Sequence, residues 1–170
     1  GATLANTAYS VNIKERYDFS CAIFDGNGDL VANAPHVPVH LGSMSESVRT
    51  VLRTNEGKIR PGDVFMMNNP FNGGTHLPDV TVIAPVLVGP TLLGFAVTRA
   101  HHANIGAHSP GSMPVSTDLA QEGIVIAPTL LEQQGRWDVP LCRRLAGLQA
   151  DAGAVLPVDN ARFADFAAQA

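Results

Sequence analysis

A long uncharged stretch over residues 80–98 constrains the fold of this chain more than any other feature. The dipeptide Gly89-Pro90 interrupts it, and because such dipeptides are typical of turns, it divides the stretch into two apolar, β-rich halves of strand length. The pattern predicts a buried β-hairpin with strands over 79–88 and 91–98. Each half is too short to cross a bilayer as a helix, so we expect no membrane span.

Shorter patterns predict how the rest of the chain is arranged around this hairpin. The further predicted elements are a hairpin over 17–24 and 29–34, a helix over 43–54, and short strands over 64–67 and 123–127. The start of the helix is inferred from Ser43 and Glu46, which have the spacing of a capping box. This order of elements favours an α+β fold of antiparallel hairpins with a few helices over the parallel sheet of a βαβ protein.

Both ends of the chain have the pattern of helices that lack start or stop signals. Residues 1–8 are helix-compatible without an N-cap, and residues 159–170 are Ala-rich, amphipathic and end without Gly or Pro. We therefore interpret residues 1–170 as a single partial domain that is truncated at both ends. With 45% apolar and 15% charged residues among its 170 positions, the chain has the composition of a protein with a core rather than of a disordered one.

The charge balance limits the classes of partner that we expect. Lys and Arg number 11 and Asp and Glu number 15, so the formal net charge is −4, and the sequence contains no basic cluster. This argues against nucleic acid and against an anionic membrane surface as partners. No signal peptide is visible. Cys21 lies in an apolar, strand-like run that predicts a buried, reduced thiol rather than a nucleophile, which is consistent with a cytoplasmic protein.

The histidines are concentrated in segments that we predict to be irregular. The six are His36, His40, His76, His101, His102 and His108. Two long predicted loops, 68–78 and 99–117, flank the central hairpin and hold four of these histidines. Structureless loops of this length in a compact domain are often functional, so these two segments are the main candidates for carrying functional residues.

Two of these histidines and a neighbouring aspartate suggest a metal site. His76 and Asp79 are three residues apart, and together they offer the nitrogen and oxygen ligands that suit Zn, Mn or Fe better than Ca. His101 leaves the hairpin at the end where Asp79 enters it, so the antiparallel geometry predicts that it meets them. Because neighbouring residues in an extended chain point to opposite sides, at most one of His101 and His102 should be a ligand. The alternative is a His–Asp hydrogen bond that only holds a turn.

A dense charged segment over residues 12–18 precedes the first predicted strand. It is either a solvated helix end with local ion pairs or a charged wall of the same pocket. In the second interpretation Glu15 and Arg16 are candidate catalytic residues, with Arg16 binding a carboxylate. Neither a phosphate-binding glycine loop nor a Gly-x-Ser-x-Gly elbow is present in the sequence.

Several segments of the chain resemble the hydantoinase B / 5-oxoprolinase family. They are SVNIKERYDFSC at 10–21, NAPHVPVHLGSM at 33–44, GGTHLPD at 73–79 and the stretch 99–114 with its PGSMP. The resemblance covers roughly residues 1–127, and more weakly 159–169, which implies the N-terminal part of a hydantoinase B-type domain. It also implies an ATP-dependent opening of a cyclic amide, most simply 5-oxo-L-proline to L-glutamate. In this family a hydantoinase A-type subunit or fused domain binds the ATP.

The resemblance also implies roles for individual residues. By motif position, the ligands of the Mn-containing acetone carboxylase branch correspond to His76, Asp79 and His101, and His102 is a candidate acid or base. The chain departs from the family at HHANIGA, where the usual HHADIGG has an aspartate in place of Asn104.

Three functions follow as hypotheses from these observations. The first is a metal-assisted hydrolase of a small cyclic amide, which works with the A-type half in an oligomer. The second is the Mn-containing subunit of an acetone- or acetophenone-type carboxylase. The third is an inactive fragment or a structural subunit. In all three cases the fragment alone is expected to be inactive, because the ATP-binding half is absent.

Overall fold

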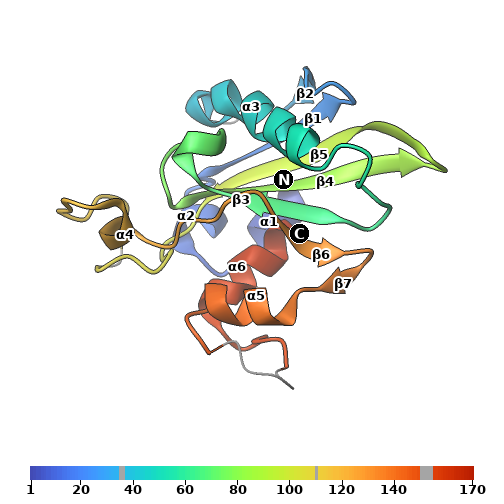
Figure 1. Cartoon of the computed structure of the whole chain (residues 1–170). Helices are drawn as coiled ribbons and strands as arrows, with labels where there is room; N and C mark the ends of the chain where they lie inside the picture. Colours follow the sequence, from blue (N-terminus) through green and yellow to red (C-terminus); the bar gives the residue numbers. More distant parts are fainter. Residues whose placement is uncertain (35–36, 110, 150–154) are drawn as a thin grey trace.

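An antiparallel sheet of seven strands organises the chain in this computed structural model, which describes residues 1–34, 37–109, 111–149 and 155–170 (Figure 1). The strand order is β2-β1-β5-β4-β3-β6-β7, and every neighbouring pair is antiparallel. The strands are β1 (Phe19–Asp25), β2 (Leu30–Asn33), β3 (Val64–Met67), β4 (Asp79–Val88), β5 (Thr91–His101), β6 (Thr129–Gln133) and β7 (Arg136–Trp137).

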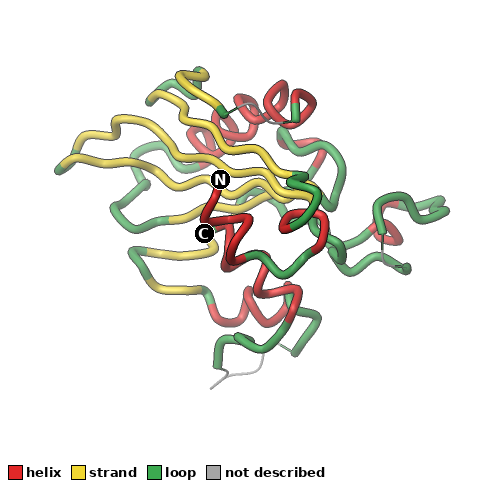
Figure 2. Tube along the Cα trace, turned by 180° about the vertical axis from the view of Figure 1, so that it is seen from behind, coloured by secondary structure: helices red, strands yellow, loops and turns green. Residues whose placement is uncertain are grey.

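Helices lie on the two faces of this sheet, except for one that is part of a loop extending away from it (Figure 1). They are α1 (Ala2–Thr7), α2 (Val11–Lys14), α3 (Pro38–Thr54), α4 (Leu119–Glu122), α5 (Val139–Leu145) and α6 (Ala161–Gln169), with a short 3₁₀ turn at Pro70–Asn72. Helix α3 packs on one face, against β1, β4 and β5. Figures 1 and 2 show α1, α2, α5 and α6 on the opposite face, where both chain ends lie close together. Among the described residues, no helix is both long and apolar enough to span a membrane.

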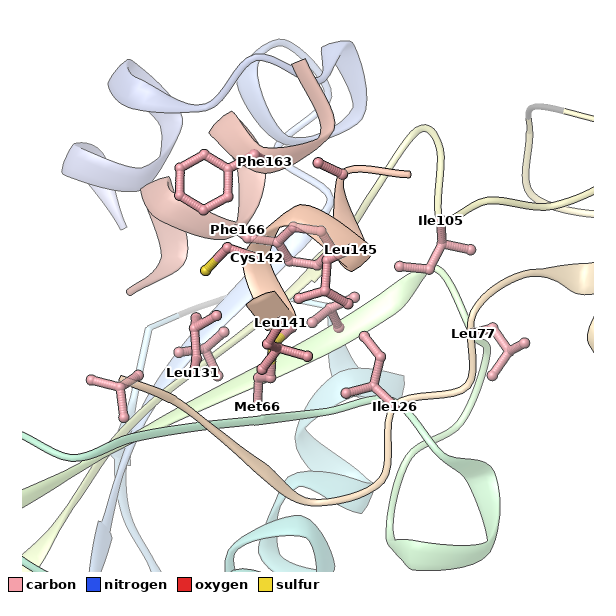
Figure 3. Close-up of a cluster of buried hydrophobic side chains, with 14 residues drawn as sticks. Met66, Leu77, Ile105, Ile126, Leu131, Leu141, Cys142, Leu145, Phe163 and Phe166 are labelled. Carbon is pink, nitrogen blue, oxygen red and sulfur yellow. The ribbon is translucent and has the colours of Figure 1, made fainter. Parts of the chain in front are cut away.

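The core is divided by the sheet into separate clusters, and this explains the continuous apolar run of the central hairpin. Ile83 of β4 packs under α3, whereas its neighbour Val82 packs under α5 and α6. Because side chains alternate between faces, a strand that is covered on both sides needs apolar residues at every position. Figure 3 shows the cluster on the side of α5 and α6, in which Phe166 of α6 and Leu145 of α5 are part of the apolar packing.

The structure confirms the predicted α+β architecture and its hairpins. In the central hairpin Val88 pairs with Thr91 beside the turn, and Asp79 pairs with His101 at the open end. The first hairpin, β1–β2, forms around the turn predicted at 25–28. Strand β3 has the predicted bounds, and both terminal segments contain helices, α1 and α6. Whether the ends are truncated stays a prediction.

Several local predictions were wrong, among them the start of a loop at residue 99, since residues 99–101 continue β5. Helix α3 begins at Pro38 rather than at Ser43, because proline fits the first turn of a helix, where its missing N–H is not needed. His40 therefore lies in a helix, not in a loop, while His36 lies outside the described residues. The predicted strand over 123–127 is absent from the described elements, and the strand of that region is β6. Cys21 is half-buried rather than buried, and both cysteines are free.

Candidate metal centre

The three predicted ligands meet at the open end of the central hairpin. Asp79 is the first residue of β4, His101 is the last of β5, and the two are direct cross-strand partners. His76 precedes β4 in a turn that is closed by a hydrogen bond from the Asp79 N–H to the His76 carbonyl (2.9 Å). One ligand atom from each of the three lies within 4.8 Å of the other two.

This arrangement fits a metal ion by both distance and chemistry. Ligand atoms that lie about 2.0–2.2 Å from one ion are at most about 4.4 Å apart, so small side-chain movements would bring all three into contact with it. Asp79 and His101 are buried and His76 is half-buried. Two imidazoles and one carboxylate leave coordination positions open for water or substrate, as catalytic metal sites do.

A short hydrogen bond couples Asp79 to His101. The Nδ1–H of His101 donates to Asp79 Oδ1 (2.7 Å), and His101 Nε2 pairs with the Ser112 hydroxyl (2.7 Å). Burial disfavours the Asp79 carboxylate, but the hydrogen bond with His101 and the nearby imidazoles outweigh it, so the pKa of Asp79 lies below its ordinary value. Burial opposes protonation of His101 as well, yet its bond to Asp79 raises the pKa of the imidazole.

His40 adds a third histidine beside Asp79. Its Nε2 lies 3.6 Å from Asp79 Oδ2 and 3.8 Å from Asp18 Oδ1, and its Nδ1 is 3.2 Å from the Ser20 hydroxyl. Burial lowers the pKa of His40, against the attraction of Asp79 and Asp18. The charge pattern at 12–18 could have pointed to Asp18, and Pro38 could have indicated the helix that carries His40. Neither residue was predicted for the site.

The glycine pair before His76 lets its loop approach other backbone very closely. Gly73 has a φ of 95°, and a Cβ there would lie 2.7 Å from the Ser47 nitrogen of α3. A Cβ on Gly74 would lie 2.2 Å from the Asn68 carbonyl oxygen. The Ser47 hydroxyl donates to the Gly73 carbonyl (2.6 Å), so the loop is attached directly to α3.

The structure places His102 on the opposite side of the strand from His101, as the alternation predicts. Its Nε2–H donates to Gln169 Oε1 (2.6 Å), and its ring packs against Phe166, 4.6 Å between centroids. Burial lowers the pKa of His102. Its Nδ1 has no hydrogen-bond partner among the described residues. The catalytic role of His102 stays a prediction, and a position among the α6 contacts does not support it.

Glu15 and Arg16 are not brought to the three predicted ligands. Both are exposed at the end of α2, and in the described part of the chain neither side chain forms an ion pair or a hydrogen bond. Their catalytic roles also stay predictions. Asn104 is exposed and accepts a hydrogen bond from Arg162 Nη2 (3.0 Å), so it too belongs to the α6 side.

The pairing with Asp79 predicts how the stability of the metal-free protein depends on pH. The pKa of His101 in the folded state is above its ordinary 6.5. The protonated imidazole paired with Asp79 therefore adds its full share to the free energy of unfolding below pH 6.5, and this share is lost as pH rises through the raised pKa. In Asp79→Asn, burial alone would lower the pKa of His101, so protonation of this histidine would destabilise the folded state instead of stabilising it. We expect the loss of unfolding free energy in Asp79→Asn to be greater at about pH 6 than at about pH 8.5. Urea denaturation in a chelator measures it, and equal losses at the two pH values would contradict the pairing.

Comparison with known proteins agrees with the resemblance that the motifs indicate. A 5-oxoprolinase of Saccharomyces cerevisiae is 50% identical over 147 residues, which cover 85% of this chain and 11% of that protein. The chain spans about a tenth of the length of the first curated relatives that it matches.

Two solved structures have the same fold. An ATP-dependent caprolactamase from Pseudomonas jessenii superposes with a TM-score of 0.80 at 25% identity, over 99% of this chain and 29% of that one. An acetone carboxylase superposes with a TM-score of 0.79 at 17% identity, over 98% of this chain and 22% of that one. The family model for hydantoinase B/oxoprolinase matches residues 1–168. The chain therefore belongs to the hydantoinase B/oxoprolinase family.

Proposed function

We propose that this chain supplies the metal-holding part of an ATP-dependent enzyme that hydrolyses a cyclic amide, with 5-oxo-L-proline as substrate and L-glutamate as product. The observation that carries the proposal is the meeting of His76, Asp79 and His101 at the open end of the hairpin. The relative named 5-oxoprolinase, at 50% identity, supports the substrate, and the ATP-dependent caprolactamase supports the reaction class.

The side chains of the site have separable tasks in this proposal. Asp79 supplies a carboxylate whose pKa is held below its ordinary value, so it stays negative at neutral pH. Its hydrogen bond orients the ring of His101, and His76 closes the set from the neighbouring loop. A Mn, Zn or Fe ion bound there would polarise the substrate's carbonyl or acyl phosphate and make a water molecule more acidic. The surrounding burial limits access by bulk water.

The activation step is assigned to a partner in this proposal. The sequence contains no phosphate-binding glycine loop, so ATP would be bound by a hydantoinase A-type subunit or fused domain, in an oligomeric assembly. The two free cysteines fit a reducing compartment such as the cytoplasm. A carboxylase function is not favoured, because the likeness to acetone carboxylase, at 17% identity, concerns the fold alone.

The test is the release of glutamate from 5-oxoproline by the intact protein together with its ATP-binding half. We expect release to require ATP and one of Mn, Zn or Fe, and to fall to background in His76→Ala. His108→Ala is the matched control, because His108 is an exposed loop histidine, and it should keep full activity. Activity in metal-free His76→Ala would contradict the mechanism, and a requirement for bicarbonate would indicate the carboxylase instead.

A further inference from the structure

Arg99 of β5 is the largest side chain with complete burial in the described structure, with 0% of its surface exposed. A guanidinium has five N–H donors, and here five hydrogen bonds use them. Nε donates to the Thr81 hydroxyl (2.8 Å), Nη1 to the His40 carbonyl (3.3 Å) and the Ser43 hydroxyl, and Nη2 to the Ser47 hydroxyl (2.9 Å) and the Gly73 carbonyl (3.1 Å). No donor is left to bind a substrate.

The acceptors belong to the three elements that surround the candidate metal centre. Thr81 lies on β4, two residues after Asp79, and His40 is part of α3. Gly73 lies in the loop that leads to His76. Arg99 itself is two residues before His101 and on the same face of β5, because side chains alternate along a strand. One side chain therefore joins all the segments that bring the predicted ligands together.

Packing and charge pairing do not by themselves account for an arginine at this position. Its acceptors are neutral, and among the described ion pairs no carboxylate is bound to it; the Asp79 carboxylate attracts it only without direct contact. Burying a charged group without an ion-pair partner is costly, and an apolar side chain would fill the same space without that cost. What an apolar side chain cannot do is hold several oxygen atoms at fixed directions, as the planar guanidinium does.

We propose that Arg99 is a positioning residue for the metal centre: it holds the Gly73 loop and the first turns of α3 against β4 and β5, so that His76 meets Asp79 and His101. The inference rests on the proposed function where it concerns metal binding. The positioning of the loop is independent of any bound ion. Arg99 is not a catalytic residue in this proposal, because its donors are fully used within the protein.

The experiment compares Arg99→Met, Arg99→Lys and Ser47→Ala with wild type in the intact protein. Ser47→Ala is the mild variant, since it removes one bond to Arg99 and one to Gly73. The matched control is Arg162→Met, which removes a half-buried arginine of α6 that donates to Asn104 and to the Leu145 carbonyl. Two quantities are measured: Mn²⁺ affinity by titration calorimetry and hydrogen exchange of the peptide over 69–79.

We expect Mn²⁺ affinity to fall about 10–100-fold in Arg99→Met, as for residues that orient metal ligands, with faster exchange over 69–79. Arg99→Lys should recover part of the loss, because lysine keeps the charge but has fewer donors. Arg162→Met should change neither quantity. If Arg99→Met does not fold, Ser47→Ala decides by the same two measurements.

The outcomes separate this inference from the proposed function. If wild type binds no Mn²⁺, Zn²⁺ or Fe²⁺, the proposed function fails, and loop exchange still decides the role of Arg99. Unchanged exchange over 69–79 in the Arg99 and Ser47 variants would overturn the inference. So would wild-type metal affinity in Arg99→Met.

Discussion

Asp79→Asn is expected to remove metal binding from this protein almost completely. The substitution keeps the shape of the side chain but takes away the carboxylate that ties the candidate centre together through His101 and His40. Changing residues that only orient metal ligands costs about 10–100-fold in affinity, so the loss of a ligand should cost about 100-fold or more. Metal content after dialysis and titration calorimetry with Mn²⁺ or Zn²⁺ measure the effect.

Asp63→Asn is the matched control for this substitution. Asp63 is as deeply buried as Asp79, but it accepts hydrogen bonds from the Arg60 and Gln134 backbone N–H groups, away from the three predicted ligands. It should lower stability and leave metal stoichiometry unchanged. Equal metal affinity in wild type and Asp79→Asn would show that Asp79 is not a ligand, and the proposed mechanism would then lose its central residue.

Gly74→Ala should be among the most destabilising substitutions of one methyl group in this chain. The new Cβ would lie 2.2 Å from the Asn68 carbonyl oxygen and 2.7 Å from that of Asn69, and both are backbone atoms. Because backbone cannot rotate away as a side chain can, the loop before His76 must shift. We expect a loss of about 3 kcal/mol or more in unfolding free energy, and a Tm lower by about 6–12 °C. Thermal and urea denaturation measure both values.

Gly42→Ala adds the same methyl group, but we expect it to raise the free energy of unfolding rather than lower it. Gly42 is exposed within α3, and nothing lies within 4 Å of a Cβ placed there. Alanine favours the helix over glycine, so stability should rise by about 0.5–1 kcal/mol. Similar destabilisation by the two variants would mean that the close approach at Gly74 is not the cause.

Local sequence patterns were enough to predict the hairpin that builds the site. A turn dipeptide and two apolar halves predict the pairing, and the pairing places Asp79 and His101 at one end, as the register confirms. The alternation of a strand further predicts that His101 and His102 separate, and they do. Both inferences depend only on neighbours in sequence and on strand geometry, which is why they succeeded.

Some of the contacts that override the sequence predictions join distant segments. Ser43 and Glu46 have capping spacing, yet Ser43 accepts a hydrogen bond from Arg99, and Glu46 pairs with Arg53. Residues near 124–126 do not form the predicted strand. The Asn68 side chain holds them instead, because it donates to the Ile124 carbonyl and accepts from the Ile126 N–H. Such partners are 50 or more residues apart in two of these cases, and spacing along the chain does not indicate them.

Local sequence patterns do not indicate the buried arginine. A charged residue at the end of an apolar strand is normally taken as the start of a solvated loop, and residues 99–101 were predicted to be loop. They continue β5 instead. Arg99 could be recognised as interior only once Ser47, Gly73 and Thr81 were known to surround it.

The direct pairing of Asp79 with His101 limits where insertions and deletions can occur in this hairpin. One residue added to β4 or β5 alone would move the register by one and turn His101 away from Asp79, unless a bulge absorbs it, as the register shift between Val86 and Leu87 already does. Additions that leave the centre intact should therefore fall in the turn at Gly89-Pro90, form a bulge, or lengthen both strands equally. We therefore expect length variation among related chains to gather at the far tip of the hairpin, while the segments nearest the two ligands stay constant in length.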